Sequence, residues 1–506
     1  MVCSVKTAAF NGISAQVVEV QACFAPGVPG FVIVGLPDKA VNESRERVRA
    51  IFGTLGVSFP REHIIINLTP ADLIKEGTHY DLPIALSLLG LLNIIKPEQI
   101  SGCLLMGALS LDGRIERVNG VLPAAVKASS LGLAMVCPKE NGQEAAWSGS
   151  KEIIAAGHIL ELINYFKGKT TIAPPALPRI EDKGYPIDMA DVKGQESAKR
   201  AMLIAAAGGH NLLMIGPPGS GKTMLAERLL TILPKMSVRE ALETAMIHSV
   251  AGLLPETIDF CRPFRAPHHS ASMPALVGGG RKGVPGEISL AHNGVLFLDE
   301  LPEFSKTTLD ALRQPLESKK AVIARVQAHT EYPADFQLIA AMNPCRCGHL
   351  GTKERMCAKA PLCAMEYLGR LSGPFLDRFD MQIEVPAVSA YDLTSDKKGT
   401  GSAEMAQKVL TAREISKERF DKLGIKNLTV NAQLKGEILE KVLDLDENLR
   451  KFSAEAAEKC GLSARGLVRI LRLARTIADL QNEKKVIKMH VMEALSYRHR
   501  LFKKPN

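Results

Sequence analysis

No run of apolar residues in this chain approaches the roughly 20 residues that a membrane-spanning helix requires. Segment 1–6 does not have the pattern of a secretory signal peptide, and neither a low-complexity tract nor a repeat of fixed period is present. Ten cysteines are spread over 506 residues without a secretory signal, which favours a reducing compartment over a disulfide framework. These absences predict a cytoplasmic protein with no membrane segment.

Length and charge indicate the number of domains and where a charged partner could bind. A chain of 506 residues predicts two to four domains, and its 46% apolar and 23% charged fractions are typical of globular proteins. The first 395 residues carry 39 basic and 39 acidic side chains, whereas the last 111 carry 24 and 15, so the net charge of +9 lies in the C-terminal part. This excess fits a surface for a polyanion, and a solvated basic helical face explains it equally well.

A glycine-rich turn lies between the apolar run 212–215 and the leucine-rich segment 224–233. The backbone N–H groups of such a turn and the positive end of the following helix form a cradle for phosphate. We expect Lys222 to reach the β- and γ-phosphates of ATP and the Thr223 hydroxyl to hold Mg²⁺. The predicted nucleotide-binding residues are Gly216, Pro217, Pro218, Gly219, Ser220, Gly221, Lys222, Thr223 and Asp299.

Two later apolar runs end in residues that suit ATP hydrolysis. Val295–Leu298 is followed by Asp299, a predicted second ligand of Mg²⁺, and by Glu300, predicted to orient and polarise the attacking water. A strand that ends at an acidic pair is strong evidence only because it follows a phosphate loop. Ile339–Met342 leads into Asn343, whose amide can bond the γ-phosphate or the water without adding charge.

The first 170 residues alternate strand-like and helix-like segments. The predicted strands are Val17–Val20, Phe31–Val34, Ile64–Leu68 and Leu104–Met106, and the predicted helices are Asp38–Phe52 and Leu82–Leu92. Gly107–Ile115 predicts a hairpin that turns at Asp112 and Gly113.

Part of this half resembles the proteolytic domain of Lon-type ATP-dependent proteases, in the segments Asn67–Gly77 and Gly107–Ala125. A Ser–Lys dyad needs a hydroxyl and a neutral amine within hydrogen-bonding reach. Where the Lon pattern has its serine this chain has Thr78–Asp81, and where the pattern has its lysine it has Val121–Pro123. The resemblance therefore implies a Lon-like α+β domain that does not cut peptides, and we interpret His79 as structural.

The middle of the chain resembles AAA+ ATPases of the magnesium chelatase branch, as found in the YifB/ComM family. The resemblance rests on the Lon-like front, on Pro263–His269 and on Ser372–Asp380 taken together. It implies that Arg378 is an arginine finger for the neighbouring subunit and that Arg465 is a second sensor that contacts the γ-phosphate. The predicted catalytic residues are Lys222, Glu300, Asn343, Arg378 and Arg465.

The same branch carries two pore loops that touch DNA in its helicases. Here the first contains three glycines followed by Arg281 and Lys282, and the second spans the pre-sensor hairpin with Lys319, Lys320 and Arg325. These five residues are the DNA-contact candidates, and incidental surface charge is the alternative for each.

Four cysteines and a histidine fall within 19 residues, at Cys345, Cys347, His349, Cys357 and Cys363. Four thiolates can close a tetrahedral Zn²⁺ site, which would be structural because no coordination position stays open. The spacing departs from the usual two-residue knuckles, and reduced loop cysteines are the alternative.

The predicted fold class is α/β, with a Lon-like α+β domain at 1–170, a linker at 171–187, an AAA+ P-loop motor at 188–395 and an α-helical lid at 396–506. Family resemblance implies a homohexamer, assembled on ATP and DNA, that acts as a helicase on single-stranded and branched DNA. Its role would be branch migration when imported DNA is integrated by homologous recombination. The alternatives are a metal-chelatase motor subunit, a protein-remodelling ATPase and a Lon-like protease; no integrin-like Asp-x-Ser-x-Ser motif supports the first.

Overall fold

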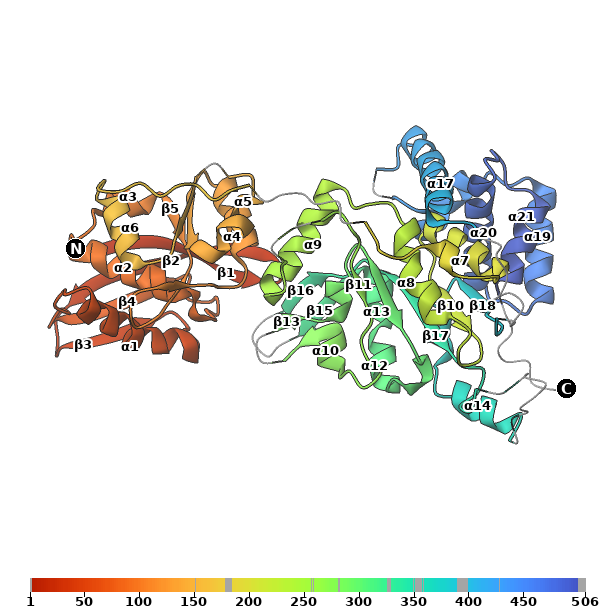
Figure 1. The fold of residues 1–506 in the computed structure, drawn as a ribbon, viewed down its shortest axis with the longest axis horizontal. Coiled ribbons are helices and arrows are strands. Elements are labelled where there is room, and N and C mark those ends of the chain that lie inside the picture. Colours follow the sequence, from red (N-terminus) through yellow and green to blue (C-terminus); the bar gives the residue numbers. More distant parts are fainter. Residues whose placement is uncertain are drawn as a thin grey trace.

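Two β-sheets lie one after the other along an elongated molecule (Figure 1). The computed structural model describes residues 2–150, 152–177, 184–255, 257, 259–280, 283–324, 329–348, 350, 357, 359–388, 399–426 and 428–498. The N-terminal residues build the seven-stranded sheet, the middle of the chain builds the five-stranded sheet, and the C-terminal helices pack beside the latter (Figure 1). Among the described helices, none combines the length and the apolar character needed to cross a bilayer.

The N-terminal sheet is mixed and is covered on both faces. Its strands in spatial order are β3 (Gly30–Val34), β4 (His63–Thr69), β2 (Ser14–Ala25), β1 (Val2–Asn11), β5 (Cys103–Leu105), β8 (Ala134–Pro138) and β9 (Ile153–Ala156). Its helices are α1 (Lys39–Thr54), α2 (Asp81–Leu91), α3 (Pro97–Ser101), α4 (Val121–Ser130), α5 (Gly142–Ala146) and α6 (Ile159–Phe166). Side chains alternate between the faces of β1, so Val5 joins the core of α1 and α2 whereas Ala8 joins that of α4. The predicted hairpin is present as β6 (Ala108–Leu109) and β7 (Ile115–Glu116).

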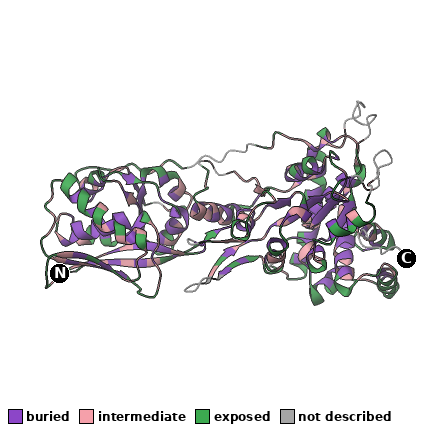
Figure 2. Cartoon of the chain, turned by 90° about the horizontal axis from the view of Figure 1, so that it is seen from below, coloured by how far each residue is buried: buried purple, intermediate pink, exposed green. Residues whose placement is uncertain are grey.

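The second sheet is wholly parallel. Its spatial order is β11 (Phe264–Arg265), β14 (Val295–Leu298), β17 (Gln337–Met342), β10 (Leu212–Ile215) and β18 (Met381–Glu384). Leu212 faces a core shared with α7 (Glu196–Gly208) and α8 (Lys222–Ile232), while Leu213 faces the opposite core. Burial on both faces explains the unbroken apolar runs in the sequence (Figure 2).

Two small hairpins lie beside this sheet. They are β12 (Gly278–Gly279) with β13 (Val284–Pro285), and β15 (Lys320–Ala324) with β16 (His329–Pro333). The Tyr332 hydroxyl donates to the carbonyl of Gly283 over 2.9 Å, which joins the two hairpins. They therefore form one structural unit.

The N-terminal domain docks on the motor at two places. The turn of the β1–β2 hairpin packs Ile13 against the motor core, and a Cβ on Gly12 would lie 2.1 Å from the Glu331 carbonyl oxygen. Farther along, Leu122 of α4 packs against Ala245 of α9 (Val238–Ala251). Because these contacts bury apolar side chains, the two parts are not simply tethered.

The C-terminal part is helical, as predicted. Its helices are α17 (Ser402–Lys422), α18 (Gly436–Leu443), α19 (Glu447–Lys459), α20 (Ala464–Leu480) and α21 (Lys488–Ser496). A short 3₁₀ turn at Asn431–Gln433 precedes α18, which begins at Gly436. Buried Asp479 of α20 accepts hydrogen bonds from Arg419 of α17 and from Arg475, which ties these helices together.

The class predicted from the sequence, an α+β front, an α/β motor and a helical C-terminal part, is confirmed. The exact limits 1–170, 171–187, 188–395 and 396–506 stay predictions.

Candidate functional site

A tight loop joins β10 to α8 at the carboxyl end of the parallel sheet. Gly219 and Gly221 have φ values of +75° and +79°, a conformation that glycine adopts without strain. A side chain on Gly216 could not fit, because its Cβ would lie 2.1 Å from the Val385 carbonyl oxygen. The side-chain amide of Gln195 donates to the Ser220 carbonyl over 2.7 Å and holds the loop from the opposite side. The backbone thus has the shape that a phosphate cradle needs.

Lys222 begins α8 and turns its ammonium group back into the loop. Its Nζ donates to the carbonyls of Gly216 at 2.8 Å and Pro217 at 2.9 Å. The Asn343 Oδ1 atom lies 3.4 Å from the same Nζ. Burial lowers the pKa of Lys222, while the nearby charge of Asp299 raises it. The structure therefore brings together three predicted elements of the ATP site: the phosphate loop, Lys222 and Asn343.

The predicted Mg²⁺ ligands also lie together. The Thr223 hydroxyl in the first turn of α8 donates to the Asp299 carboxylate over 2.9 Å. Asp299 follows β14, and β17 lies between β14 and β10, so three strand ends converge on one site. A hydroxyl and a carboxylate oxygen at this distance are a donor set that suits Mg²⁺.

Glu300 follows Asp299 in a left-handed conformation, with φ of +50°, and its side chain is 54% exposed. Its Oε2 atom lies 3.5 Å from Nδ1 of His269. We did not predict His269 as a site residue. The sequence feature that could have identified it is its position at the end of the segment Pro263–His269. This segment contains β11, which pairs with β14.

Arg378 lies at the other end of the sheet. Asn211, just before β10, donates its side-chain amide to the Arg378 carbonyl over 3.1 Å. The four residues of β10 separate this point from the phosphate loop by about 13 Å at some 3.3 Å per residue. The Arg378 guanidinium pairs with Glu317 at 2.6 Å. Arg378 therefore does not face the chain's own phosphate loop.

Arg465 is at the same end as Arg378. Both line a groove of about 1720 Å³ between the motor sheet and the C-terminal helices, together with Arg469. Burial lowers the pKa of Arg378, Glu317 raises it, and neighbouring arginines that include Arg469 and Arg465 lower it further. The two predicted arginines thus share one basic surface.

The DNA candidates divide into two groups. Lys319 pairs with Asp335 at 2.6 Å and Lys320 pairs with Glu331 at 2.8 Å, on half-exposed surfaces. Such exposed pairs contribute at most about 1 kcal/mol and can exchange partners. Arg281, Lys282 and Arg325 lie outside the described residues.

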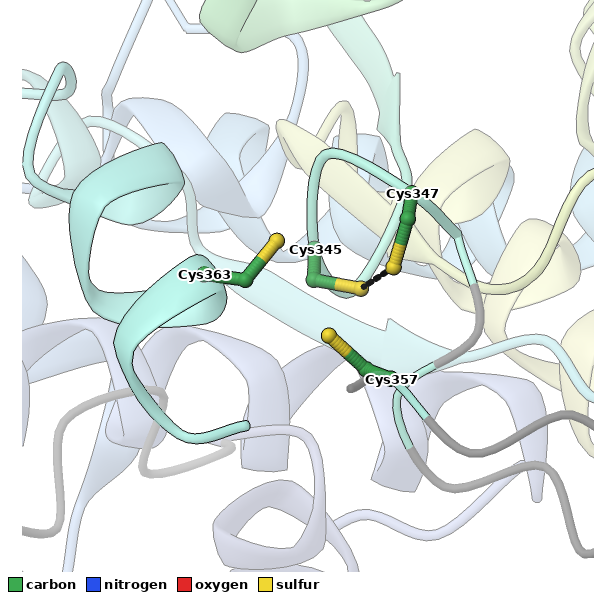
Figure 3. Close-up of side chains that lie close together, drawn as sticks. All are labelled: Cys345, Cys347, Cys357 and Cys363. Carbon is green, nitrogen blue, oxygen red and sulfur yellow. Dashed lines mark hydrogen bonds between the residues drawn. The ribbon is translucent and has the colours of Figure 1, made fainter. Parts of the chain in front are cut away.

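The side chains of four cysteines converge (Figure 3), and Gly348 of the same segment packs on Pro218 of the phosphate loop. The sulfur atoms of Cys345, Cys347, Cys357 and Cys363 all lie within 4.8 Å of one another. Sγ of Cys345 and Sγ of Cys347 are 3.3 Å apart, well beyond the roughly 2.05 Å of a disulfide. Tetrahedral Zn²⁺ with bonds of about 2.3 Å would place its sulfur ligands about 3.8 Å apart, so the donor set fits this metal.

In the N-terminal domain, His79 and Asp81 make buried contacts. Nε2 of His79 lies 2.8 Å from the Ala8 carbonyl oxygen, and burial lowers the pKa of His79. The Asp81 carboxylate is fully buried and accepts from Arg47 at 2.7 and 2.9 Å and from the Leu109 N–H at 3.2 Å. Both side chains therefore have structural partners.

Comparison with known proteins gives a consistent family. Three family models match: "Magnesium chelatase, subunit ChlI" over residues 188–393, "Subunit ChlI of Mg-chelatase" over 18–141, and "Magnesium chelatase, subunit ChlI C-terminal" over 399–498. Competence protein ComM of Haemophilus influenzae is 44% identical over 499 residues, which cover 96% of this chain and 95% of ComM. Uncharacterized protein YifB of Salmonella typhimurium is 42% identical over 498 residues, covering 98% and 96%. Lon protease 2 of Bacillus subtilis is 25% identical over 185 residues, covering 32% and 34%.

Proposed function

Because the chain belongs to the YifB/ComM family of magnesium-chelatase-like AAA+ ATPases, we propose that it is a ring-forming DNA helicase that drives branch migration. The proposal that the subunits form a ring rests on the position of Arg378, which lies at the end of the sheet opposite to its own phosphate loop. An arginine finger stabilises charge on the transferring phosphoryl group and must reach it. Arg378 can do so only in a neighbouring copy of the chain.

Within one subunit, the ATP site would work through residues that already lie together. The loop N–H groups and Lys222 would bind the phosphates, and Thr223 and Asp299 would hold Mg²⁺, which neutralises charge on the phosphates when bound. Glu300 would accept a proton from the attacking water, and the Asn343 amide would fix the position of that water or of the γ-phosphate. Arg378 and Arg465 of the adjacent subunit would complete the site, so hydrolysis would require assembly into a homohexamer.

The DNA role is supported by three observations. The excess basic charge lies in the C-terminal 111 residues. The two hairpins that carry the DNA candidates contact each other through Tyr332 and Gly283, so they would move as one unit when nucleotide changes. The name of the Haemophilus relative links that protein to competence, which fits branch migration during integration of imported DNA. The proposed location is the cytoplasm, where single-stranded and branched DNA would be available.

The decisive measurement is ATP-driven branch migration on a labelled three-stranded DNA. We expect the full-length protein to move the branch, and the Glu300→Gln variant to bind the same DNA without moving it. A protein that hydrolyses ATP but neither binds nor moves DNA would contradict the helicase proposal. The alternatives would then be a protein-remodelling ATPase with a client bound by the N-terminal domain, or a motor subunit that acts on a chelatase partner.

We also propose that the four clustered thiols hold a structural Zn²⁺ ion. The purified protein is expected to contain about one zinc per chain, because four thiolates complete a tetrahedral site. Elemental analysis should show that Cys363→Ser loses this zinc, whereas Cys460→Ser, outside the cluster, keeps it. Wild-type protein without zinc, purified under reducing conditions, would contradict the proposal.

A further inference from the structure

The segment that carries two of the clustered cysteines touches the phosphate loop at both of its ends. At its start, Oδ1 of Asn343 lies 3.4 Å from Nζ of Lys222. At its end, Gly348 packs on Pro218: a Cβ added to Gly348 would lie 2.6 Å from Cδ and 2.7 Å from Cγ of that proline. Cys345 and Cys347 lie between these two contacts.

Gly348 supports a part of the loop that has little other packing. Pro218 and Gly219 form an exposed crest of the phosphate loop, and a Cβ on Gly219 would meet no atom within 4 Å. The base of the loop is held differently, by Gln195 and by the close approach of Gly216 to Val385. The crest is therefore positioned from one side, by the turn in which the Gly348 N–H donates to the Cys345 carbonyl over 2.9 Å.

The helix that carries Cys363 leads to the segment that follows the catalytic candidate Glu300. Cys363 lies on α14 (Leu362–Leu368), and soon after this helix Arg370 pairs with Glu303 at 2.9 Å. Glu303 belongs to the short turn that directly follows Glu300. A metal held by all four sulfurs would thus connect the turn that packs on the phosphate loop to the segment that follows Glu300.

We infer that metal bound by Cys345, Cys347, Cys357 and Cys363 positions the crest of the phosphate loop through the Gly348–Pro218 contact, so that metal occupancy controls the affinity for ATP. This inference rests on the proposed occupancy of the cluster by Zn²⁺. The physical reason is that phosphate affinity depends on loop N–H groups that are fixed before the ligand arrives. Loss of the metal releases the turn. ATP binding must then order the crest, and the free-energy cost of this ordering lowers the affinity for ATP.

The test measures zinc content and ATP affinity separately in the full-length protein, with a fluorescent ATP analogue and Mg²⁺. Cys363→Ser is expected to lose zinc and to bind the analogue about tenfold more weakly, the factor that corresponds to about 1.4 kcal/mol. Adding Zn²⁺ to chelator-stripped wild type should restore tight binding, whereas the same addition to Cys363→Ser should not. Cys460→Ser is the matched control for loss of a thiol.

Gly348→Ala tests the contact without removing a sulfur ligand. It is expected to retain zinc and to weaken ATP binding by a similar factor, because its new methyl group meets Pro218. Gly424→Ala is the matched control: its φ of +70° imposes the same backbone strain, but its Cβ would meet nothing within 4 Å. Circular dichroism of each variant would exclude unfolding.

The two proposals fail in different ways. If zinc is lost from Cys363→Ser and ATP affinity is unchanged, the zinc site stands and its control of the phosphate loop is wrong. An unchanged affinity in zinc-containing Gly348→Ala also overturns the inference. If wild type contains no zinc, the zinc proposal falls and the inference falls with it.

Discussion

Replacing Arg378 with alanine is expected to lower the rate of ATP hydrolysis by about 10³-fold, the lower part of the range for arginine fingers, and to leave ATP binding nearly unchanged. The reason is positional. Arg378 is held near Asn211 at the amino end of β10, whereas the phosphate loop is at the carboxyl end of the same strand. In the proposed ring the side chain acts on the phosphoryl group bound by an adjacent subunit, so its removal should lower turnover and leave the affinity of the chain's own loop unchanged.

A mixing experiment tests that geometry directly. Lys222→Ala subunits should not bind ATP, and Arg378→Ala subunits should bind but not hydrolyse it. When the two inactive variants are mixed, some interfaces pair an intact phosphate loop with an intact finger, and ATPase activity should partly return. Absence of recovery in mixed rings of confirmed composition would contradict action between subunits. Arg450→Ala, an exposed arginine of α19, is the matched control for loss of a guanidinium.

The second large effect is expected for Glu300→Gln, with hydrolysis slowed by about 10²- to 10³-fold and ATP still bound. Glutamine has the same size as glutamate but cannot accept the proton of the attacking water. The adjacent Mg²⁺ ligands are unaffected, because the Thr223–Asp299 hydrogen bond does not involve Glu300. Single-turnover hydrolysis and analogue binding, measured on the same sample, separate the two steps.

Two comparisons keep the Glu300 result interpretable. Glu227→Gln removes an equal charge from an exposed position of α8 and should hydrolyse ATP normally. Lys222→Ala should lose binding itself, because its ammonium lies inside the loop. Hydrolysis by Glu300→Gln at the wild-type rate would remove this residue from the catalytic role.

The local parts of the ATP site could be predicted because their chemistry is encoded in short stretches of chain. Residues 211–223 contain the strand, the glycines with left-handed φ and the start of the helix that carries Lys222 and Thr223. A buried parallel strand requires a continuous apolar run, so Val295–Leu298 and Ile339–Met342 were recognisable too. Asp299 and Asn343 were predicted to act on the nucleotide that the loop binds, and they meet the loop because parallel strands end at one edge of the sheet.

Other features depend on segments that are distant in sequence and could not be predicted by spacing. Lys319 and Lys320 stay candidates for DNA contact, and their ion pairs with Asp335 and Glu331 could not be read from the sequence. His269 reaches Glu300 only because β11 lies next to β14. The spacing of the cysteines left both zinc and reduced thiols open, whereas the folded chain brings all four sulfurs within 4.8 Å of one another.

The sequence by itself determined the identity of the ATP-binding elements, the α/β class and the family, because each depends on residue types at fixed local separations. Tertiary structure alone decided which end of the sheet each arginine occupies, and hence that Arg378 and Arg465 lie apart from their own phosphate loop. It also decided that Gly348 meets Pro218, 130 positions away in the chain. Such contacts follow from the order in which strands pair in the sheet, and local sequence pattern does not specify that order.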